Sequence, residues 1–229
     1  MDSSKSIGRI VGILFIIGTA AGILSVVFTQ PVLKESDVLV KVSANEQQFI
    51  TGLVFLLIMG FSLAWVPIMM YPVLKKYNKI LAVGYVVFRG GIETVAYLIT
   101  GIFWILIAVL GKQYANATAS DAAGYKILSD LLMEGAKRST AVTMIVFSLG
   151  AIILYYSLFK SKLIPTWLSV WGLLSIVLYL GAGVYALFKP SVDILLMPLA
   201  LQEMVMAVWL IAKGFNRSEI IHKQVKMEV

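Results

Sequence analysis

The sequence predicts an all-α, polytopic integral membrane protein with six transmembrane helices. Of its 229 residues, 60% are hydrophobic and only 14% are charged, whereas a soluble domain averages about 45–50% apolar and about 25% charged residues. The apolar residues form long runs without charge, typical of helices that cross a bilayer with about 20 residues each. Most lysines and arginines fall between these runs. Together these observations predict a single helical transmembrane domain over residues 1–229.

The first predicted span covers residues 10–29 and follows a short basic N-terminus. A cleaved signal peptide is the alternative, because Lys5 and Arg9 precede the apolar run and small residues interrupt it. The apolar run continues well past those small residues, which favours an uncleaved anchor. Gly18 and Gly22 are four residues apart, a spacing that predicts close packing against another helix.

The second and third spans are predicted over residues 49–71 and 80–110. At Pro72 the second helix is expected to stop or bend, because proline has no amide proton to continue a helix. Ser43 followed by Glu46 is a capping-box pattern, so we expect that helix to begin between these two residues and the apolar run. A lysine-rich turn separates the two spans.

A long segment precedes the fourth span, which is predicted over residues 141–159. Within it, residues 121–138 alternate leucines and charges at helical spacing, which predicts an amphipathic helix on the membrane or over the bundle mouth. Gly135 is expected to separate this helix from the span.

The last two spans are predicted over residues 163–188 and 194–212. Trp167 and Trp171 near the start of the fifth span are typical of the membrane–water interface. Residues 213–229 form a polar tail, which we expect to be cytoplasmic.

The distribution of charge predicts the orientation. With the N-terminus inside, the inner segments carry a net charge of +8 and the outer segments a net charge of 0. Both termini are therefore expected in the cytoplasm, and the amphipathic helix between spans three and four is expected outside. The formal charge of +7 follows from this topology and does not indicate a nucleic-acid partner. It favours anionic lipid headgroups at the cytoplasmic face.

The third span carries the most unusual pattern in the chain. Tyr85, Arg89, Glu93 and Tyr97 are four residues apart, so a helix places them on one stripe. A spanning helix turns such a stripe toward a bundle interior or a wet cavity rather than toward lipid.

The sixth span carries Gln202 and Glu203. Arg89 lies ten residues after Lys79 and Glu203 ten before Lys213, so each is about 15 Å from the same edge, near the midplane of the membrane. Opposite charges at one depth predict a pair. Two interpretations stay open: a structural brace between spans three and six, or a site that binds a solute or relays a proton.

Several kinds of site are excluded by composition. The chain has no cysteine, and its one histidine is His222 in the tail, which excludes thiolate chemistry, a bis-histidine haem and a zinc protease site. No lysine or aspartate lies within a span, and no phosphate-binding glycine loop or serine elbow is present. We therefore expect no metal and no cofactor, and enzyme activity has no specific support.

Several motifs together resemble a bacterial membrane protein family known as domain of unknown function 4386. The similarity covers roughly residues 8–216 and implies a polytopic protein of the bacterial inner membrane, but no activity. The residues that carry it are Ser43-Ala44-Asn45-Glu46, Tyr71-Pro72-Val73-Leu74-Lys75, Gly84-Tyr85, Phe88-Arg89, Glu93, Pro165-Thr166-Trp167-Leu168-Ser169-Val170-Trp171-Gly172, Glu203-Met204-Val205 and Trp209-Leu210-Ile211.

The sequence is therefore consistent with two functions. The first is a membrane protein that binds or moves a small solute or a proton through the polar midplane cluster. The second is a non-transporting sensor or assembly subunit, in which the Arg89–Glu203 pair is a brace. The sequence does not decide between them.

Overall fold

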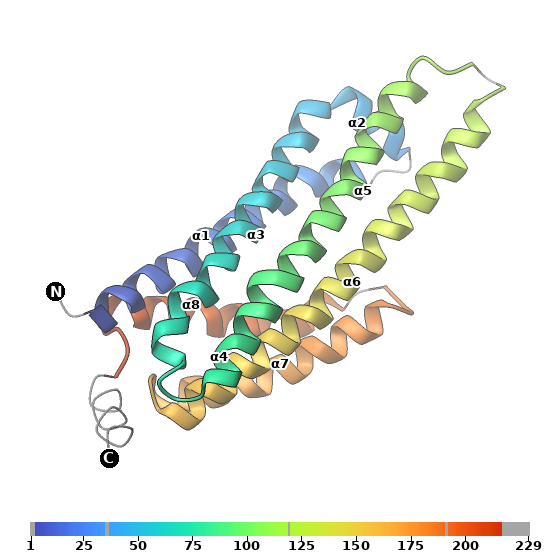
Figure 1. Ribbon diagram of the computed structural model, residues 1–229. Coiled ribbons are helices and arrows are strands. Elements are labelled where there is room, and N and C mark those ends of the chain that lie inside the picture. The colour runs from blue at the N-terminus through green and yellow to red at the C-terminus, as the bar shows by residue number, and fades with distance from the viewer. Residues whose placement is uncertain (1–2, 35–36, 119, 191, 217–229) are drawn as a thin grey trace.

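A computed structural model describes residues 3–34, 37–118, 120–190 and 192–216 of the chain (Figure 1). These residues are mostly helical and include no strand. The predicted tail is described only as far as Asn216, and its remaining residues, 217–229, lie outside the described part.

Six helical segments in the described residues are long and apolar enough to cross a membrane. The third begins as α4 (Lys79–Tyr85) and continues through a π-helical turn, η1 (Val86–Ile92), into α5 (Glu93–Tyr114). The sixth begins with a 3₁₀ turn, η2 (Asp193–Leu196), and continues as α8 (Met197–Ala212). A short helix, α2 (Val38–Ala44), joins the first two spans. The other four spans are α1 (Ser3–Leu33), α3 (Glu46–Leu74), α6 (Ala122–Ser161) and α7 (Thr166–Ala186).

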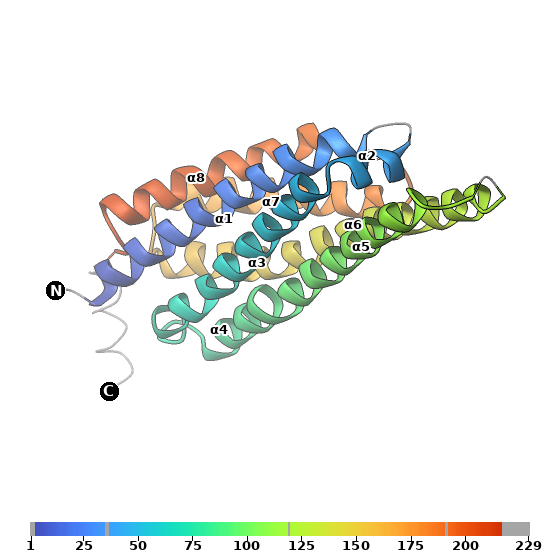
Figure 2. The same cartoon turned by 90° about the horizontal axis from the view of Figure 1, so that it is seen from above.

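The six spans form a closed ring in chain order. Each span packs against the next one, from α1 and α3 through α5, α6 and α7 to α8, and α8 packs back against α1. Figures 1 and 2 show α1 beside α8 at the closure of this ring. Because the ring has six members, the third and sixth spans lie opposite each other across its centre.

Glycines on α1 allow close packing against both neighbouring helices, as predicted for Gly18 and Gly22. A Cβ on Gly18 or Gly22 would lie 2.7 Å from a side-chain atom of Leu63 or Met59, respectively, on α3. On the other side of α1, a Cβ on Gly12 would lie 2.5 Å from a backbone carbonyl of α8. Helices in a membrane associate through such close contacts because lipid is as apolar as their side chains.

The outer surface of the ring is apolar. Leu174, Val208 and Ile23 are 67%, 61% and 60% exposed, and similar side chains cover the outward faces of the other spans. A monomeric soluble protein rarely exposes contiguous apolar patches of this extent. The six spans therefore have the surface of a multi-pass membrane protein.

The segment predicted as a separate amphipathic helix is helical but is not separate. It is the first part of α6, which runs for 40 residues without interruption and projects with α5 at one end of the bundle (Figure 1). Gly135, the expected break, lies inside the helix, where a Cβ would lie 2.5 Å from the Phe103 ring on α5. This glycine therefore allows two helices to approach and does not end one.

The predicted capping box is wrong. Ser43 lies within α2, and Asn45 is the residue that precedes α3. The side-chain amide of Asn45 donates to the carbonyl of Lys41 at 2.9 Å, so it ends α2 and does not cap α3. The segment before span two thus contains an additional short helix, α2.

Candidate functional site

The third span changes its winding at the arginine. In η1 the backbone forms π-helical hydrogen bonds, and the amide of Glu93 donates to the carbonyl of Phe88 five residues earlier. Gly90 and Gly91 lie in this turn, and the Thr94 hydroxyl donates to the Gly90 carbonyl at 2.8 Å. Single π turns inside α-helices are frequent at functional sites.

The π turn keeps the polar stripe aligned. In an α-helix, four residues overshoot one full turn by about 40°, so a stripe with four-residue spacing drifts around the helix. A π turn takes more than four residues, so the same spacing falls short of a full turn and offsets this drift. Tyr85, Arg89 and Glu93 are consequently all buried, with at most 2% of each exposed.

Arg89 is held by three neighbours. Its Nη1 donates to both carboxylate oxygens of Glu93, at 2.9 and 3.0 Å. Its guanidinium carbon lies 4.3 Å from the centroid of the Phe147 ring on α6, a cation–π contact. A Cβ on Gly150, one turn further along α6, would lie 3.3 Å from both the backbone nitrogen and the Cβ of Arg89. Helix α6 therefore supports both the backbone and the charge of Arg89.

Glu203 reaches the same arginine from the opposite side of the ring. Its Oε1 lies 3.8 Å from Nη2 of Arg89, an ion pair beyond hydrogen-bond distance. Arg89 and Glu93 are 2% and 1% exposed, whereas Glu203 is 16% exposed. We call Arg89, Glu93 and Glu203 the charged cluster. It contains two carboxylates and one guanidinium, and the guanidinium donates its short hydrogen bonds to Glu93 only.

The two tyrosines of the stripe lie on either side of this cluster. Tyr85 is fully buried, and its hydroxyl lies near the Arg89 guanidinium without making a hydrogen bond to any described residue. Tyr97 packs its ring over Gly60 of α3 and faces Glu93. A buried hydroxyl without a hydrogen-bond partner costs free energy. The Tyr85 hydroxyl is therefore a polar group at the bundle centre that destabilises the fold.

Gln202 does not join the charged cluster. Its Oε1 accepts from the Tyr155 hydroxyl of α6 at 2.6 Å, and its Nε2 donates to the carbonyl of Leu168 in α7 at 3.0 Å. We call Tyr155, Gln202 and the Leu168 carbonyl the amide cluster. Adjacent residues of one helix thus enter two different polar clusters, because neighbours on a helix point about 100° apart.

The sequence analysis missed Phe147, Gly150 and Tyr155. All three lie on the inward face of α6. On a helix, Gly150 and Tyr155 point about 60° and about 80° to either side of Phe147. The three residues therefore lie on one half of the helix, and the inward face of span four could be read from the sequence. Nothing in the sequence identified that face as the neighbour of Arg89, because the packing order of the spans was unknown.

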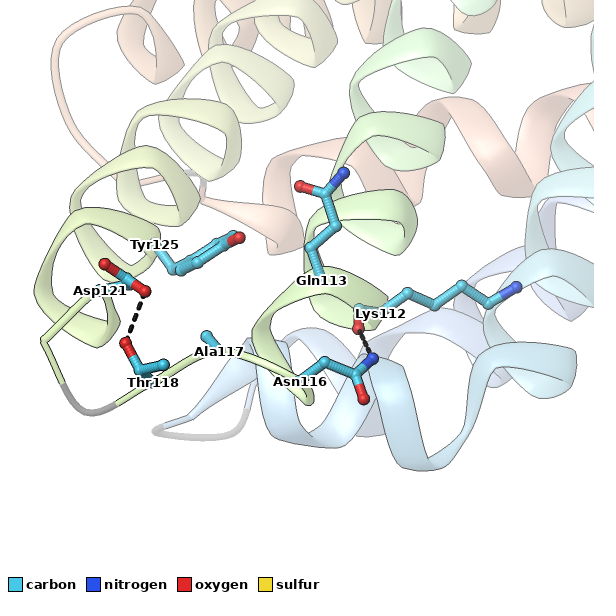
Figure 3. Close-up of a pocket in the computed structure, with 7 residues that line it drawn as sticks. All are labelled: Lys112, Gln113, Asn116, Ala117, Thr118, Asp121 and Tyr125. Carbon is cyan, nitrogen blue, oxygen red and sulfur yellow. Dashed lines mark hydrogen bonds between the residues drawn. The ribbon is translucent and has the colours of Figure 1, made fainter.

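Hollows elsewhere in the structure lie at the two ends of the bundle. The one in Figure 3, about 470 Å³, lies where α5 ends and α6 begins. Two hydrogen bonds join residues of its lining: Thr118 donates to Asp121, and Asn116 donates to the carbonyl of Lys112. Within the described part of the chain, no three His, Cys, Asp or Glu side chains gather as a metal site would require.

Most of the chain matches a known protein family. The family described as "Domain of unknown function (DUF4386)" matches residues 10–214, which include most of α1 and all of the other five spans. The chain belongs to this family. A search of curated proteins and a search of solved structures gave no match. The matched residues include both the charged cluster and the amide cluster. The family description assigns an activity to neither cluster, so the function is inferred from their geometry.

Proposed function

We propose that the protein binds a proton at Glu203, in the centre of its helix bundle, and moves it across the membrane. The observation that carries this proposal is the surplus carboxylate. Arg89 gives both of its short hydrogen bonds to Glu93, and Glu203 lies 3.8 Å away. One guanidinium cannot balance two carboxylates, so the cluster is neutral only with one added proton or monovalent cation.

A proton fits this site better than a larger solute. Arg89 and Glu93 are almost completely enclosed, which leaves little space for a solute beside them. Glu203 is the member of the cluster that is partly accessible, so it is the group that can exchange a proton. Ionisable residues inside a membrane are costly, and they commonly mark proton relays and ion pathways.

The experiment is proton flux in liposomes that contain the purified protein and an internal pH-sensitive dye. With a membrane potential imposed, the wild type is expected to acidify or alkalinise the lumen faster than protein-free liposomes. Glu203→Gln keeps the shape of the side chain but cannot exchange a proton, so its flux should fall to background. Glu134→Gln is the matched control, because Glu134 pairs with Arg138 on the exposed part of α6.

Two results would contradict the proposal. Wild-type flux at background would favour the second function, in which the charged cluster is a brace in a sensor or assembly subunit. Equal flux in the wild type and Glu203→Gln would place the pathway elsewhere. Thermal unfolding of each variant in detergent checks that loss of flux is not loss of fold.

We also propose that the protein lies in a bacterial inner membrane with both termini in the cytoplasm, as the charge asymmetry favours. Reporter fusions after Lys76, Lys162 and Lys213 are then expected to report a cytoplasmic location. Fusions near Lys41 and Lys189 are expected to report the outside. One reversed fusion would overturn this orientation.

A further inference from the structure

A hollow of about 350 Å³ lies at the end of the bundle where α1 begins. One side is the turn between α6 and α7, and the other is the end of α8 with the residues that follow it. Lys162 and Thr166 line the first side, and Trp209 and Lys213 line the second.

The backbone around this hollow is fixed by several contacts. Lys162 adopts a left-handed conformation with a φ of 55°, and its amide donates to the carbonyl of Leu158 at 3.0 Å. The amide of Asn216 donates to the carbonyl of Leu163 at 2.8 Å, which joins the two sides. Gly214 has a φ of 74°, and a Cβ there would lie 3.1 Å from the Cα of Lys5. The α6–α7 turn, the residues after α8 and the start of α1 therefore contact one another around the hollow and fix its backbone.

The hollow is positive and has no acidic side chain in its lining. Lys162 and Lys213 are exposed, and neither forms an ion pair with a residue in the described ranges. Thr166 begins α7, a helix of 21 residues, and the first amides of a helix have no intrahelical acceptor and attract anions. By contrast, the hollow at the other end contains Asp121, and its Lys112 pairs with Glu46 at 2.6 Å.

The aromatic residues place this hollow at the depth of lipid headgroups. Trp209 forms part of its wall. Trp167, in the first turn of α7, is 54% exposed and stacks on Trp171 with 6.3 Å between ring centroids. Tryptophans concentrate at the level of the headgroups, where the apolar ring meets lipid and the N–H meets water.

We propose that this hollow binds the phosphate group of an anionic lipid headgroup. The two lysines and the start of α7 would contact the phosphate oxygens, and the Trp209 ring would pack against the glycerol end of the lipid. This site is separate from the charged cluster, so it stands whether or not the protein moves protons.

Thermal unfolding of the full chain in detergent tests this site. The three additions are a short-chain phosphatidylglycerol, a phosphatidylcholine of equal chain length, and inorganic phosphate. Phosphatidylglycerol is expected to raise the Tm of the wild type by several degrees, because a ligand that binds only the folded state stabilises it. Phosphatidylcholine should raise the Tm much less.

The double variant Lys162→Gln/Lys213→Gln is expected to lose the phosphatidylglycerol shift. Lys75→Gln/Lys79→Gln is the matched control, because it removes two exposed lysines from a different turn at the same end of the bundle. The control should keep the full shift. An equal loss in both double variants would mean general charge attraction and would overturn the proposed site.

Inorganic phosphate distinguishes the source of the phosphate group. If it gives the same shift at the same concentration, and phosphatidylglycerol adds nothing, the ligand is a soluble phosphate and the lipid assignment fails. No shift with any of the three additions would overturn the site altogether.

Discussion

The bundle contains two buried polar clusters, and adjacent residues of α8 belong to one each. The amide cluster is neutral, and both functional groups of Gln202 have a partner, at 2.6 and 3.0 Å. The charged cluster has one tight pair and a second acid at 3.8 Å. The Tyr85 hydroxyl beside it makes no hydrogen bond within the described part of the chain. The amide cluster joins α6, α7 and α8. The charged cluster joins the third span to α8, and the Phe147 ring beside Arg89 connects it to α6, so the number of helices involved does not distinguish the two.

The difference indicates what each cluster is for. A buried polar network in which every member is satisfied stiffens a fold and specifies its packing. A buried charge without a full complement of partners costs stability, and such a cost is commonly associated with function. The amide cluster therefore has the properties of a clamp between α6, α7 and α8, and the charged cluster has those expected of the proton site that we propose.

Removing the arginine should have the largest effect. Arg89→Leu leaves Glu93 and Glu203 buried without a cation, and loss of one partner of a buried pair costs about 3–5 kcal/mol. The double variant Arg89→Leu/Glu203→Leu should cost less than the sum of the two single changes, because residues in contact are not additive. Unfolding in detergent measures all three variants. Strict additivity would show that Glu203 does not interact with Arg89, despite the distance of 3.8 Å.

Breaking the amide cluster should have the second largest effect. Gln202→Leu leaves the Tyr155 hydroxyl and the Leu168 carbonyl unpaired, which costs about 1–3 kcal/mol. Its proton flux should match the wild type once the protein is folded. Gln113→Leu, on the exposed end of α5, is the control for the loss of an amide. A flux as low as that of Glu203→Gln would show that the two clusters act as one.

A smaller net effect is expected from Gly150→Ala, because the higher helix propensity of alanine, about 1 kcal/mol, offsets part of the packing cost. The new methyl group would lie 3.3 Å from the backbone of Arg89, and overpacking of this kind costs about 1–3 kcal/mol. Gly181→Ala in α7 is the control, because a Cβ there has no heavy atom within 4 Å, and alanine favours a helix by about 1 kcal/mol over glycine. The two substitutions should therefore change stability in opposite directions. Equal gains would mean that the contact between α6 and Arg89 is not tight.

The smallest effect should come from Tyr85→Phe. The Tyr85 hydroxyl has no hydrogen-bond partner among the residues that the structure describes, so its removal should leave the free energy of unfolding unchanged or raise it by less than about 1 kcal/mol. Tyr155→Phe, which removes a hydroxyl bonded to Gln202, should lower it by about 1 kcal/mol. A clear loss of stability in Tyr85→Phe would indicate a bound water or ion on that hydroxyl.

Much of this architecture could be predicted from the sequence. The lengths of the apolar runs predicted the six spans, which the structure confirms. The sequence motifs predicted the family that matches residues 10–214. Counting residues from the basic turns placed Arg89 and Glu203 at one depth, and the structure places them 3.8 Å apart. These predictions succeeded because they depend on membrane thickness and helix rise, which are the same for every spanning helix.

The remaining features depend on contacts between helices. The order of the ring, the continuity of α6 through Gly135 and the support of Arg89 by Phe147 all require knowledge of which spans are neighbours. The π turn has no clear sequence signal, because paired glycines also occur in loops and at close packing contacts. Gln202 was grouped with Glu203 because the two are adjacent, although they point to different partners.

The pair formed by Arg89 and Glu93 also bears on how the protein is made. Membrane proteins are synthesised from the N-terminus, so the third span enters the bilayer before Glu203, on the last span, has been translated. An arginine at the centre of an isolated span would cost about 2.5–3.5 kcal/mol on the insertion scale. Because Glu93 follows within the same helix and takes both short hydrogen bonds of Arg89, this span carries its own counter-charge into the lipid. Insertion of the third helix can thus precede closure of the ring.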